Sequence, residues 1–392
     1  MIKCLKYLIP GVLLISNTCS KKEIAPPSFE VNIKDTLSIA ASAWFSSMEI
    51  IPLETVEASL IHGCDKIEYD GQQYYIFDSQ QFAVFVFDNS GKFLFSTLSS
   101  KGNGPGEYLT MTDIAINRTT GNLETLDVGS RKIFIFDKNG SYIKDLTLPR
   151  DLLPLGTFRS LSDKFYLFYS ADRHEDGECI HVYAAEEQRV VNRMFWMKSS
   201  SEDHLVKTRI EPFYWIDSVM MFSQMFPNND VYQIHADLKM KKRYSYDFGS
   251  KTFDASSLPK DEDPSYYRSF VPNNMGKYAF PFLKFENSNY LFCFFVLDNY
   301  YDFYVSRHKK SQRGEQMTAE VITAKFKDGG KIHPPMLFDN DYMYCVIEPS
   351  QIPDLMNDLL TDEQKDMLNK ISENDNPLIV KYRYQYRRSH QK

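Results

Sequence analysis

The sequence predicts an all-β fold, a six-bladed β-propeller of four-stranded antiparallel blades. Three observations support this prediction. Aromatic residues make up 15% of the 392 residues, and aromatic side chains are enriched in strands. A unit of about 50 residues occurs twice in succession, which is the length of a propeller blade. Further runs of alternating apolar and polar residues then follow at similar spacing up to the C-terminus.

The first two copies of the repeat define the blade pattern. "YYIFDSQQFAVFVFDNSGKFLFSTL" starts at Tyr74 and "LETLDVGSRKIFIFDKNGSYIKDLTL" at Leu123, so that Asp78 falls on Asp127 at an offset of 49 residues. Each copy holds an alternating run, a turn led by Asp, a second run ending in Phe-Asp, and a hairpin turn with Gly. The runs "CDKIEYD" and "TDIAINR" that precede them complete four strands a unit. Fainter copies follow, and over all the copies second strands begin near residues 73, 122, 165, 219, 290 and 342, which gives six blades.

The two ends of the chain are expected to close the ring. The sixth unit lacks a fourth strand, and residues 46–54, "SSMEIIPLE", can supply it from the N-terminal side. Such closure removes open sheet edges. An open β-sandwich with similar hairpins is the alternative fold. Within the sixth unit, the spacing of apolar residues over 349–377 predicts two short amphipathic helices, the second beginning at Asp362 after Thr361.

The first residues have the pattern of an export signal. Lys3 and Lys6 precede the apolar run 8–15, which is shorter than the ~20 apolar residues of a membrane-spanning helix. Residues 1–18 resemble a bacterial lipoprotein signal peptide, and this resemblance implies that Cys19 is lipidated. We expect residues 19–40 to be the lipidated Cys and its polar tether, and residues 41–392 to be the propeller domain. The exported domain would then be anchored to the outer membrane, on its periplasmic or surface side.

The net charge bears on the expected partners, and the cysteine spacing bears on disulfide formation. The formal net charge is −7, with no large basic surface in prospect, so we expect no nucleic-acid partner. The cysteines are widely spaced without a CxxC pair, and a chain of this size can build a core without disulfides. Free, mostly buried thiols are therefore the preferred interpretation, with disulfide pairing left open, for Cys64, Cys179, Cys293 and Cys345.

The segment "KGNGPGEY", residues 101–108, joins the outer strand of the first unit to the inner strand of the second. No helix and no Lys-Ser/Thr pair follows, so it is not a phosphate-binding loop. A structural corner is the preferred interpretation, with ligand contact by its last two residues as the alternative. Asp at equivalent turns of both copies is typical of turn capping. The candidate ligand-binding residues are Glu107, Tyr108, Asp127, Arg131 and Asp78.

A family resemblance rests on four segments, "GNGPGEY", "FDNSGK", "FDKNGS" and "NDNPLIVKYRY". With them the chain resembles the six-bladed β-propeller lipoproteins of Bacteroidetes, which are similar to NHL-type propellers. The resemblance covers roughly residues 40–386. It implies a fold and a location in the cell envelope, and it implies no activity.

The sequence favours binding over catalysis. The longer insertions are expected on one face of the propeller, and binding residues commonly lie on loops of a rigid scaffold. No GxSxG, HExxH or SxxK motif occurs, so we predict no catalytic residue, no metal and no cofactor. The expected partner is a glycan, a peptide or an envelope protein, with membrane contact only through the lipid anchor. The alternative is a metal-dependent lyase or lactonase-type hydrolase in the central channel, although the first two inner strands offer Lys66, Glu68, Ala115 and Asn117 and no repeated His.

Overall fold

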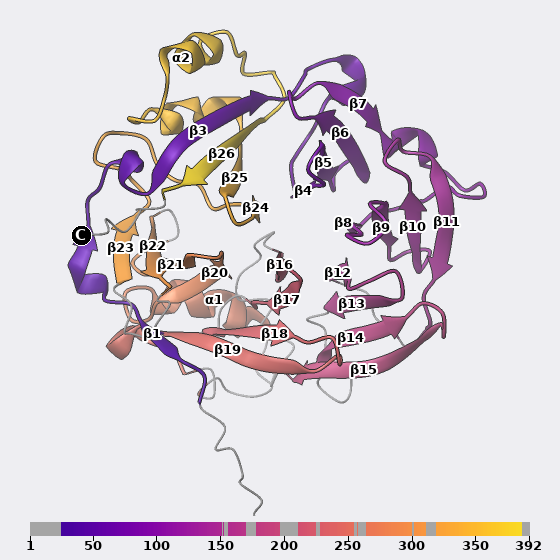
Figure 1. The fold of residues 1–392 in the computed structure, drawn as a ribbon, viewed down its shortest axis with the longest axis horizontal. Coiled ribbons are helices and arrows are strands. Elements are labelled where there is room, and N and C mark those ends of the chain that lie inside the picture. The colour runs from indigo at the N-terminus through magenta and orange to yellow at the C-terminus, as the bar shows by residue number, and fades with distance from the viewer. Residues whose placement is uncertain are drawn as a thin grey trace, which may run out of the picture.

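Six sheets form a ring around a central channel (Figure 1). The computed structural model describes residues 25–150, 152, 156–169, 178–196, 211–224, 228–254, 257, 264–299, 302–310 and 319–385. Each sheet is a blade of four antiparallel strands, and two blades carry one strand more. The prediction of an all-β, six-bladed propeller is confirmed. The predicted signal peptide 1–18 and Cys19 lie outside the described residues.

The first three blades follow one another along the chain, and their strands pair in chain order from the channel outward. Blade one consists of β4 (Lys66–Tyr69), β5 (Gln73–Asp78), β6 (Ala83–Asp88) and β7 (Phe93–Ser96). Blade two consists of β8 (Asp113–Ile116), β9 (Leu123–Asp127), β10 (Lys132–Phe136) and β11 (Tyr142–Thr147). Blade three consists of β12 (Thr157–Ser160), β13 (Phe165–Tyr169), β14 (Glu178–Ala184) and β15 (Arg189–Trp196).

The last three blades combine consecutive strands with strands from the N-terminal segment. Blade four consists of β16 (Phe213–Ile216), β17 (Val219–Phe222), β18 (Asp230–Ile234), β19 (Met240–Asp247) and β1 (Ser28–Glu30). Blade five consists of β20 (Phe280–Glu286), β21 (Tyr290–Val296), β22 (Phe303–Lys309), β23 (Ala319–Thr323) and β2 (Thr36–Leu37). Blade six consists of β24 (Leu337–Phe338), β25 (Tyr342–Ile347), β26 (Leu378–Tyr384) and β3 (Phe45–Pro52).

Strand β3 closes the ring as the sequence predicts. It pairs antiparallel with β26, from Leu378 opposite Pro52 to Tyr384 opposite Phe45. The hairpin turn between β6 and β7 packs blade one against β3. Gly91 in that turn has φ +84, and a Cβ at this position would collide with the carbonyl oxygen of Pro52. The "FDNSGK" turn therefore requires glycine both for its backbone conformation and for its contact with β3.

Strands β1 and β2 are additions that the sequence analysis did not predict. They pair in parallel with the outer strands β19 and β23, and they lie within residues 19–40, which we had assigned to the tether. Figure 1 shows them in indigo along the outside of blades four and five. The outer edge of a blade exposes unpaired backbone amides and carbonyls, and an extended segment nearby satisfies them. The ordered propeller therefore begins before residue 41.

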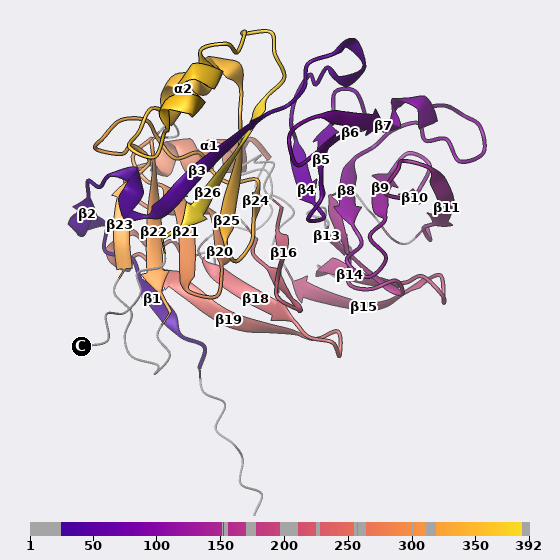
Figure 2. The same cartoon turned by 45° about the horizontal axis from the view of Figure 1, so that its top comes forward.

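The insertion in blade six forms two helical turns over the propeller (Figure 2). Pro349–Leu355 is a 3-10 helix, and Asp362–Leu368 is the α-helix α2, with Thr361 as its N-cap. The prediction places both segments correctly, and Pro353 inside the first accounts for its not being an α-helix. A second α-helix, α1 (Pro264–Asn274), lies between blades four and five. No helix among the described residues is long and apolar enough to cross a membrane.

Short 3-10 helices occupy several of the connections between strands. Besides the one in blade six, they are Ile33–Asp35, Ala41–Ala43, Glu57–Ser59, Thr97–Ser100 and Gly249–Lys251.

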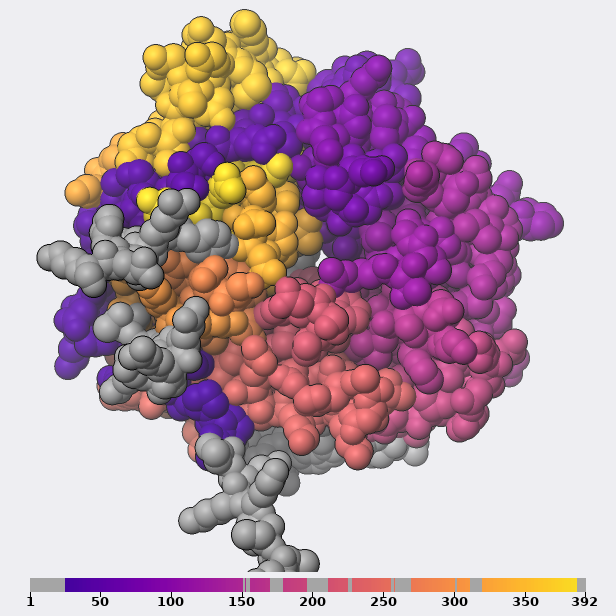
Figure 3. Space-filling view, in the orientation of Figure 1, coloured from indigo at the N-terminus to yellow at the C-terminus, as the bar shows by residue number. Residues whose placement is uncertain are grey.

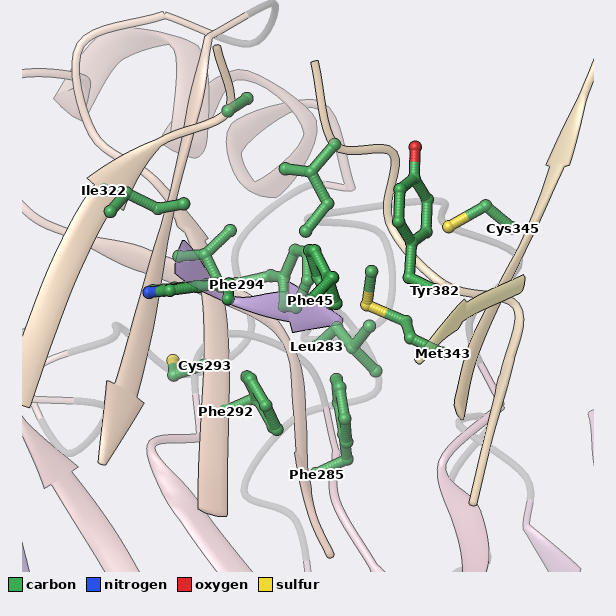
Figure 4. Close-up of a cluster of buried hydrophobic side chains, with 14 of the residues drawn as sticks. Phe45, Leu283, Phe285, Phe292, Cys293, Phe294, Ile322, Met343, Cys345 and Tyr382 are labelled. Carbon is green, nitrogen blue, oxygen red and sulfur yellow. The ribbon is translucent and has the colours of Figure 1, made fainter. Parts of the chain in front are cut away.

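Hydrophobic clusters fill the spaces between neighbouring blades. The largest joins blades four, five and six, and Figure 4 shows part of it around Leu283, Phe285 and Phe292. Phe285 is fully buried and stacks on Phe338 with 4.0 Å between ring centroids. Three of the four described cysteines are buried, as the sequence suggested. The aromatic side chains thus pack mainly between the blades.

Candidate functional site

The central channel has two different ends. We call the turn face the end where the turns between the first two strands of each blade lie, such as β4–β5 and β8–β9. We call the insertion face the opposite end, where α1 and the blade-six insertion lie. A cavity of about 490 Å³ opens on the turn face, and Figure 3 shows a hollow at the centre of the ring. This cavity is the candidate site.

The floor of the cavity is a cluster of charged side chains, which we call the floor cluster: Lys66, Glu68, Asp113, Arg159 and Glu211. Lys66 Nζ lies 2.5 Å from Asp113 Oδ1 and 2.6 Å from Glu211 Oε2. Arg159 NH2 lies 2.6 Å from Glu68 Oε1 and 3.2 Å from Glu211 Oε2. These residues come from β4, β8, β12 and the segment entering β16, so four consecutive blades contribute to one network.

Backbone and hydroxyl groups hold the floor cluster in place. The amide of Phe158 donates to Asp113 Oδ2 over 2.8 Å, and Arg159 donates to the carbonyl oxygen of Ile114 over 3.0 Å. The Thr157 hydroxyl lies 2.5 Å from Asp113 Oδ2 and 3.0 Å from Glu211 Oε2. Such contacts fix the rotamers of the charged groups, as a binding site requires.

Burial governs the protonation of the floor cluster. It raises the pKa of Glu68, and the nearby Arg159 and Lys66 lower that pKa only in part, while Glu211 and Asp113 raise it further. For Arg159, burial alone would lower the pKa, but Glu211, Glu68 and Asp113 outweigh it and raise the pKa. The cluster holds three carboxylates and two cations, and Glu68 is the carboxylate whose pKa burial raises.

Aromatic rings form another part of the cavity lining, which we call the aromatic wall. Its rings belong to Tyr69, Phe213, Tyr214, Trp215 and Phe338. The guanidinium of Arg118 lies over the Trp215 ring, 5.2 Å from its centroid, and donates to the carbonyl oxygen of Asp217. A pocket with a mostly apolar lining and a few convergent polar groups is typical of small-molecule sites.

A second cavity, of about 410 Å³, lies toward the insertion face. It shares Glu211, Met336 and Phe338 with the first cavity, and it adds Cys64 and His333. His333 Nε2 lies 3.1 Å from Asp354 Oδ2, while burial lowers the pKa of this histidine. Among the described residues no group of three His, Cys, Asp or Glu side chains is arranged to hold a metal ion.

Two of the sequence candidates cap turns on the insertion face. Asp78 is fully buried and accepts hydrogen bonds from the backbone amides of His62, Gln80 and Gln81. Asp127 is also buried and accepts from the amides of Leu109, Thr110 and Ser130. These bonds lower the pKa of Asp127 despite its burial. Neither carboxylate lines the two cavities.

The remaining candidates also make contacts within the protein. Arg131 has φ +58 and donates to the carbonyl oxygens of Pro149 and Leu152.

In "KGNGPGEY", Glu107 folds back to accept from the amide of Gly104 over 2.7 Å, and the fully buried Tyr108 is bonded to Thr97. The segment is a corner between blades one and two, and none of the five candidates lines either of the two cavities described above.

Sequence reasoning found two members of the floor cluster and missed three. Lys66 and Glu68 were noted as residues of the first inner strand. Asp113, Arg159 and Glu211 were not noted, although Asp113 begins the second inner strand as Lys66 begins the first, at blade spacing. That recurrence was the available signal, because equivalent positions of neighbouring inner strands meet in the channel.

Similarity to known proteins agrees with the propeller fold. A family model described as a domain of unknown function, DUF4934, matches residues 27–383. No curated protein matches the chain by sequence. The crystal structure of a Bacteroides fragilis protein proposed to be exported aligns with a TM-score of 0.70 at 15% identity, over 92% of this chain and 100% of that one. A member of the DUF4221 family from Bacteroides vulgatus aligns with a TM-score of 0.54 at 9% identity, over 87% and 97%. At these identities the likeness shows the fold alone.

Proposed function

Since the chain belongs to the DUF4934 family, for which no function is described, we propose from its geometry that it is a binding propeller. The cavity on the turn face takes a small polar ligand, or the polar end of a glycan or peptide. One observation carries this proposal: residues of the charged floor cluster and of the aromatic wall line the same cavity of about 490 Å³. Polar groups there would orient the ligand, and the rings would cover its apolar surface.

The energetics of the floor cluster support a functional role. Burying charged pairs gains little stability compared with apolar residues of the same volume, because desolvation offsets their attraction. Lys66 and Arg159 are each only 10% exposed in their side chains. A cluster of this kind in a cavity, with a perturbed carboxyl group, is typical of a site that acts on a ligand.

For the location of the protein, we propose export and anchoring by a lipid on Cys19. The basic and apolar residues before Cys19 support this proposal, as does the fold shared with a Bacteroides fragilis protein proposed to be exported. Replacement of Cys19 by Ser tests it directly. The wild-type protein should fractionate with membranes, and the C19S variant should be released from them. Equal membrane association of both would contradict the anchor.

Ligand binding can be measured by the fluorescence of Trp215, which lines the cavity. The purified protein would be titrated with glycan and peptide libraries, and each response would be confirmed by calorimetry. In the variant Ile116→Trp, a large ring occupies the cavity, so binding should fall strongly. The matched control Leu94→Trp adds the same ring to an exposed position on β7.

Two results would contradict the proposal. One is the absence of binding across the libraries. The other is binding that Ile116→Trp leaves unchanged, since that ligand would occupy a different surface.

A further inference from the structure

We propose that the ligand of the turn-face cavity carries a protonated amine, which binds at Glu68. This inference rests on the proposed function, that the cavity binds a ligand, and it adds the chemical class. The charge balance of the described lining, the hydrogen bonding of each carboxylate and the aromatic wall all support it.

Carboxylates outnumber cations around the cavity. The ionisable side chains of the lining are Lys66, Glu68, Asp70, Arg118, Arg159, Glu211 and Asp339, and Asp113 lies beneath them against Lys66. Five carboxylates thus face three cations. In a site with low-dielectric walls, such an imbalance attracts a positively charged ligand and repels an anionic one.

Two carboxylates of the floor cluster already have partners on both oxygens. Asp113 Oδ1 pairs with Lys66, and its Oδ2 accepts from the Phe158 amide. Glu211 Oε2 pairs with Lys66, and its Oε1 accepts from the Phe213 amide over 3.2 Å. Both carboxylates therefore have hydrogen-bond partners within the protein and do not need a ligand to supply them.

The carboxylates at the cavity mouth are satisfied by their own turns. Asp70 accepts from the amides of Gln72 and Gln73 and from the hydroxyl of Tyr75. Asp339 has the same arrangement in the β24–β25 turn, with two backbone amides and the hydroxyl of Tyr344. These two residues shape the turns and contribute charge without offering a free oxygen.

Glu68 differs from the other four carboxylates. Its Oε1 lies 2.6 Å from Arg159 NH2 and 3.9 Å from Lys66 Nζ, and within the described part of the chain this buried oxygen has no hydrogen-bond partner of good geometry. The side chain is 12% exposed and lines the cavity. An ammonium group at this carboxylate would complete the hydrogen bonding of Glu68 and balance the excess charge of the floor cluster.

The aromatic wall suits the carbon skeleton of such a ligand. Cations are attracted to the faces of aromatic rings, and Arg118 over Trp215 already shows this arrangement at the mouth. Tyr69, Phe213 and Phe338 supply further rings of the lining. A ligand with an amine beside a flat or apolar body would contact both the floor cluster and the aromatic wall.

Protonation gives a signature of this binding mode. The groups around Glu68 are Lys66, Arg159, Glu211 and Asp113, with Tyr69 next to it in the strand. Burial raises the pKa of Glu68, and a bound ammonium would lower it again. Uptake of an amine near that pKa should therefore release a proton from Glu68, and affinity should weaken as the pH falls.

The experiment compares amines with their own N-acetyl derivatives, which have nearly the same shape and no charge. Calorimetry with glucosamine, tyramine and lysinamide, each against its N-acetylated form, would be performed on the purified protein in two buffers of different ionisation enthalpy. We expect at least one amine to bind about tenfold more tightly than its acetylated form, with release of a proton. The variant Glu68→Gln should abolish this preference, and Glu57→Gln, at an exposed position, should retain it.

The outcomes separate the two proposals. If neutral or anionic probes bind the cavity as well as the amines, or if Glu68→Gln keeps the preference, the amine inference is wrong and the binding function stands. If an amine binds equally to the Ile116→Trp variant, its site lies elsewhere and both proposals fail for this cavity. If no probe of any charge binds, the amine inference is likewise rejected.

Discussion

The two sides of the central channel differ in chemistry. Blades one to three contribute the charged residues Lys66, Glu68, Asp113 and Arg159 from their inner strands. On the other side, β24 of blade six contributes Phe338, which stacks on the buried Phe285 of β20 in blade five. Side chains on the first side are held by ion pairs, and those on the second side by ring stacking.

This difference indicates a division between stability and binding. The aromatic side continues into the large cluster that joins blades four, five and six, and its burial supplies hydrophobic free energy. The charged side gains little net stability from its paired groups. We therefore expect substitutions on the aromatic side to affect mainly folding, and those on the charged side to affect folding less and the cavity more.

The largest effect is expected for Phe285→Ala. Phe285 is fully buried and stacks on Phe338 and Phe292, so its removal leaves a cavity and should lower the free energy of unfolding by about 3–5 kcal/mol. Urea denaturation followed by circular dichroism measures this. Leu109→Ala, at a position 49% exposed, should change stability by less than about 0.5 kcal/mol. If both variants lose similar free energy of unfolding, the aromatic side does not have the stabilising role proposed for it.

Arg159→Met should be the most damaging change on the charged side. It leaves Glu68 and Glu211 without one of their cations, and breaking a buried pair in this way costs about 3 kcal/mol. Denaturation at pH 7 would measure the loss.

Adding Glu68→Gln to Arg159→Met should recover part of that stability, because one uncompensated charge disappears. If the double variant is instead less stable than the sum of the two single changes, the charges do not couple as the distances indicate.

Thr157→Val tests the hydroxyl that lies between Asp113 and Glu211. Its shape is preserved while two polar contacts are lost, so stability should fall by about 1–2 kcal/mol. Thr119→Val, at an exposed position, is the matched control and should be nearly neutral. A neutral result at Thr157 would mean that the carboxylates do not need this hydroxyl.

The smallest change is expected for Glu68→Gln, and it depends on pH. The pKa of Glu68 is raised above its ordinary value of 4.5 in the folded protein, so the folded state binds this proton more tightly than the unfolded chain. Stability therefore falls as the pH rises from 4.5 through the folded pKa. Glu68→Gln should remove that part of the fall and be neutral or slightly stabilising at pH 7. If the free energy of unfolding of Glu68→Gln changes with pH in the same way as that of the wild type, this prediction is wrong.

The sequence allowed much of the fold to be predicted and little of the site. Repeated turns with Asp88 and Gly91 define the blades, because turn chemistry and strand alternation act over a few residues. Lys66 and Glu68 were noted since they lie in a recognisable inner strand. Arg159 and Glu211 were missed because β12 is short and Glu211 precedes its strand, so no local pattern marked them.

The amino-acid sequence by itself determined the all-β class, the six-blade repeat and the closure by residues 46–54, since each of these follows from local periodicity and turn residues. Only the tertiary structure decided which charged residues meet. Lys66, Asp113, Arg159 and Glu211 lie about a blade apart in the chain, and ring closure brings them within hydrogen-bond distance. The tertiary structure also pairs β1 and β2 with the outer edges of blades four and five. Contacts of this kind depend on the packing of whole blades, which no short segment encodes.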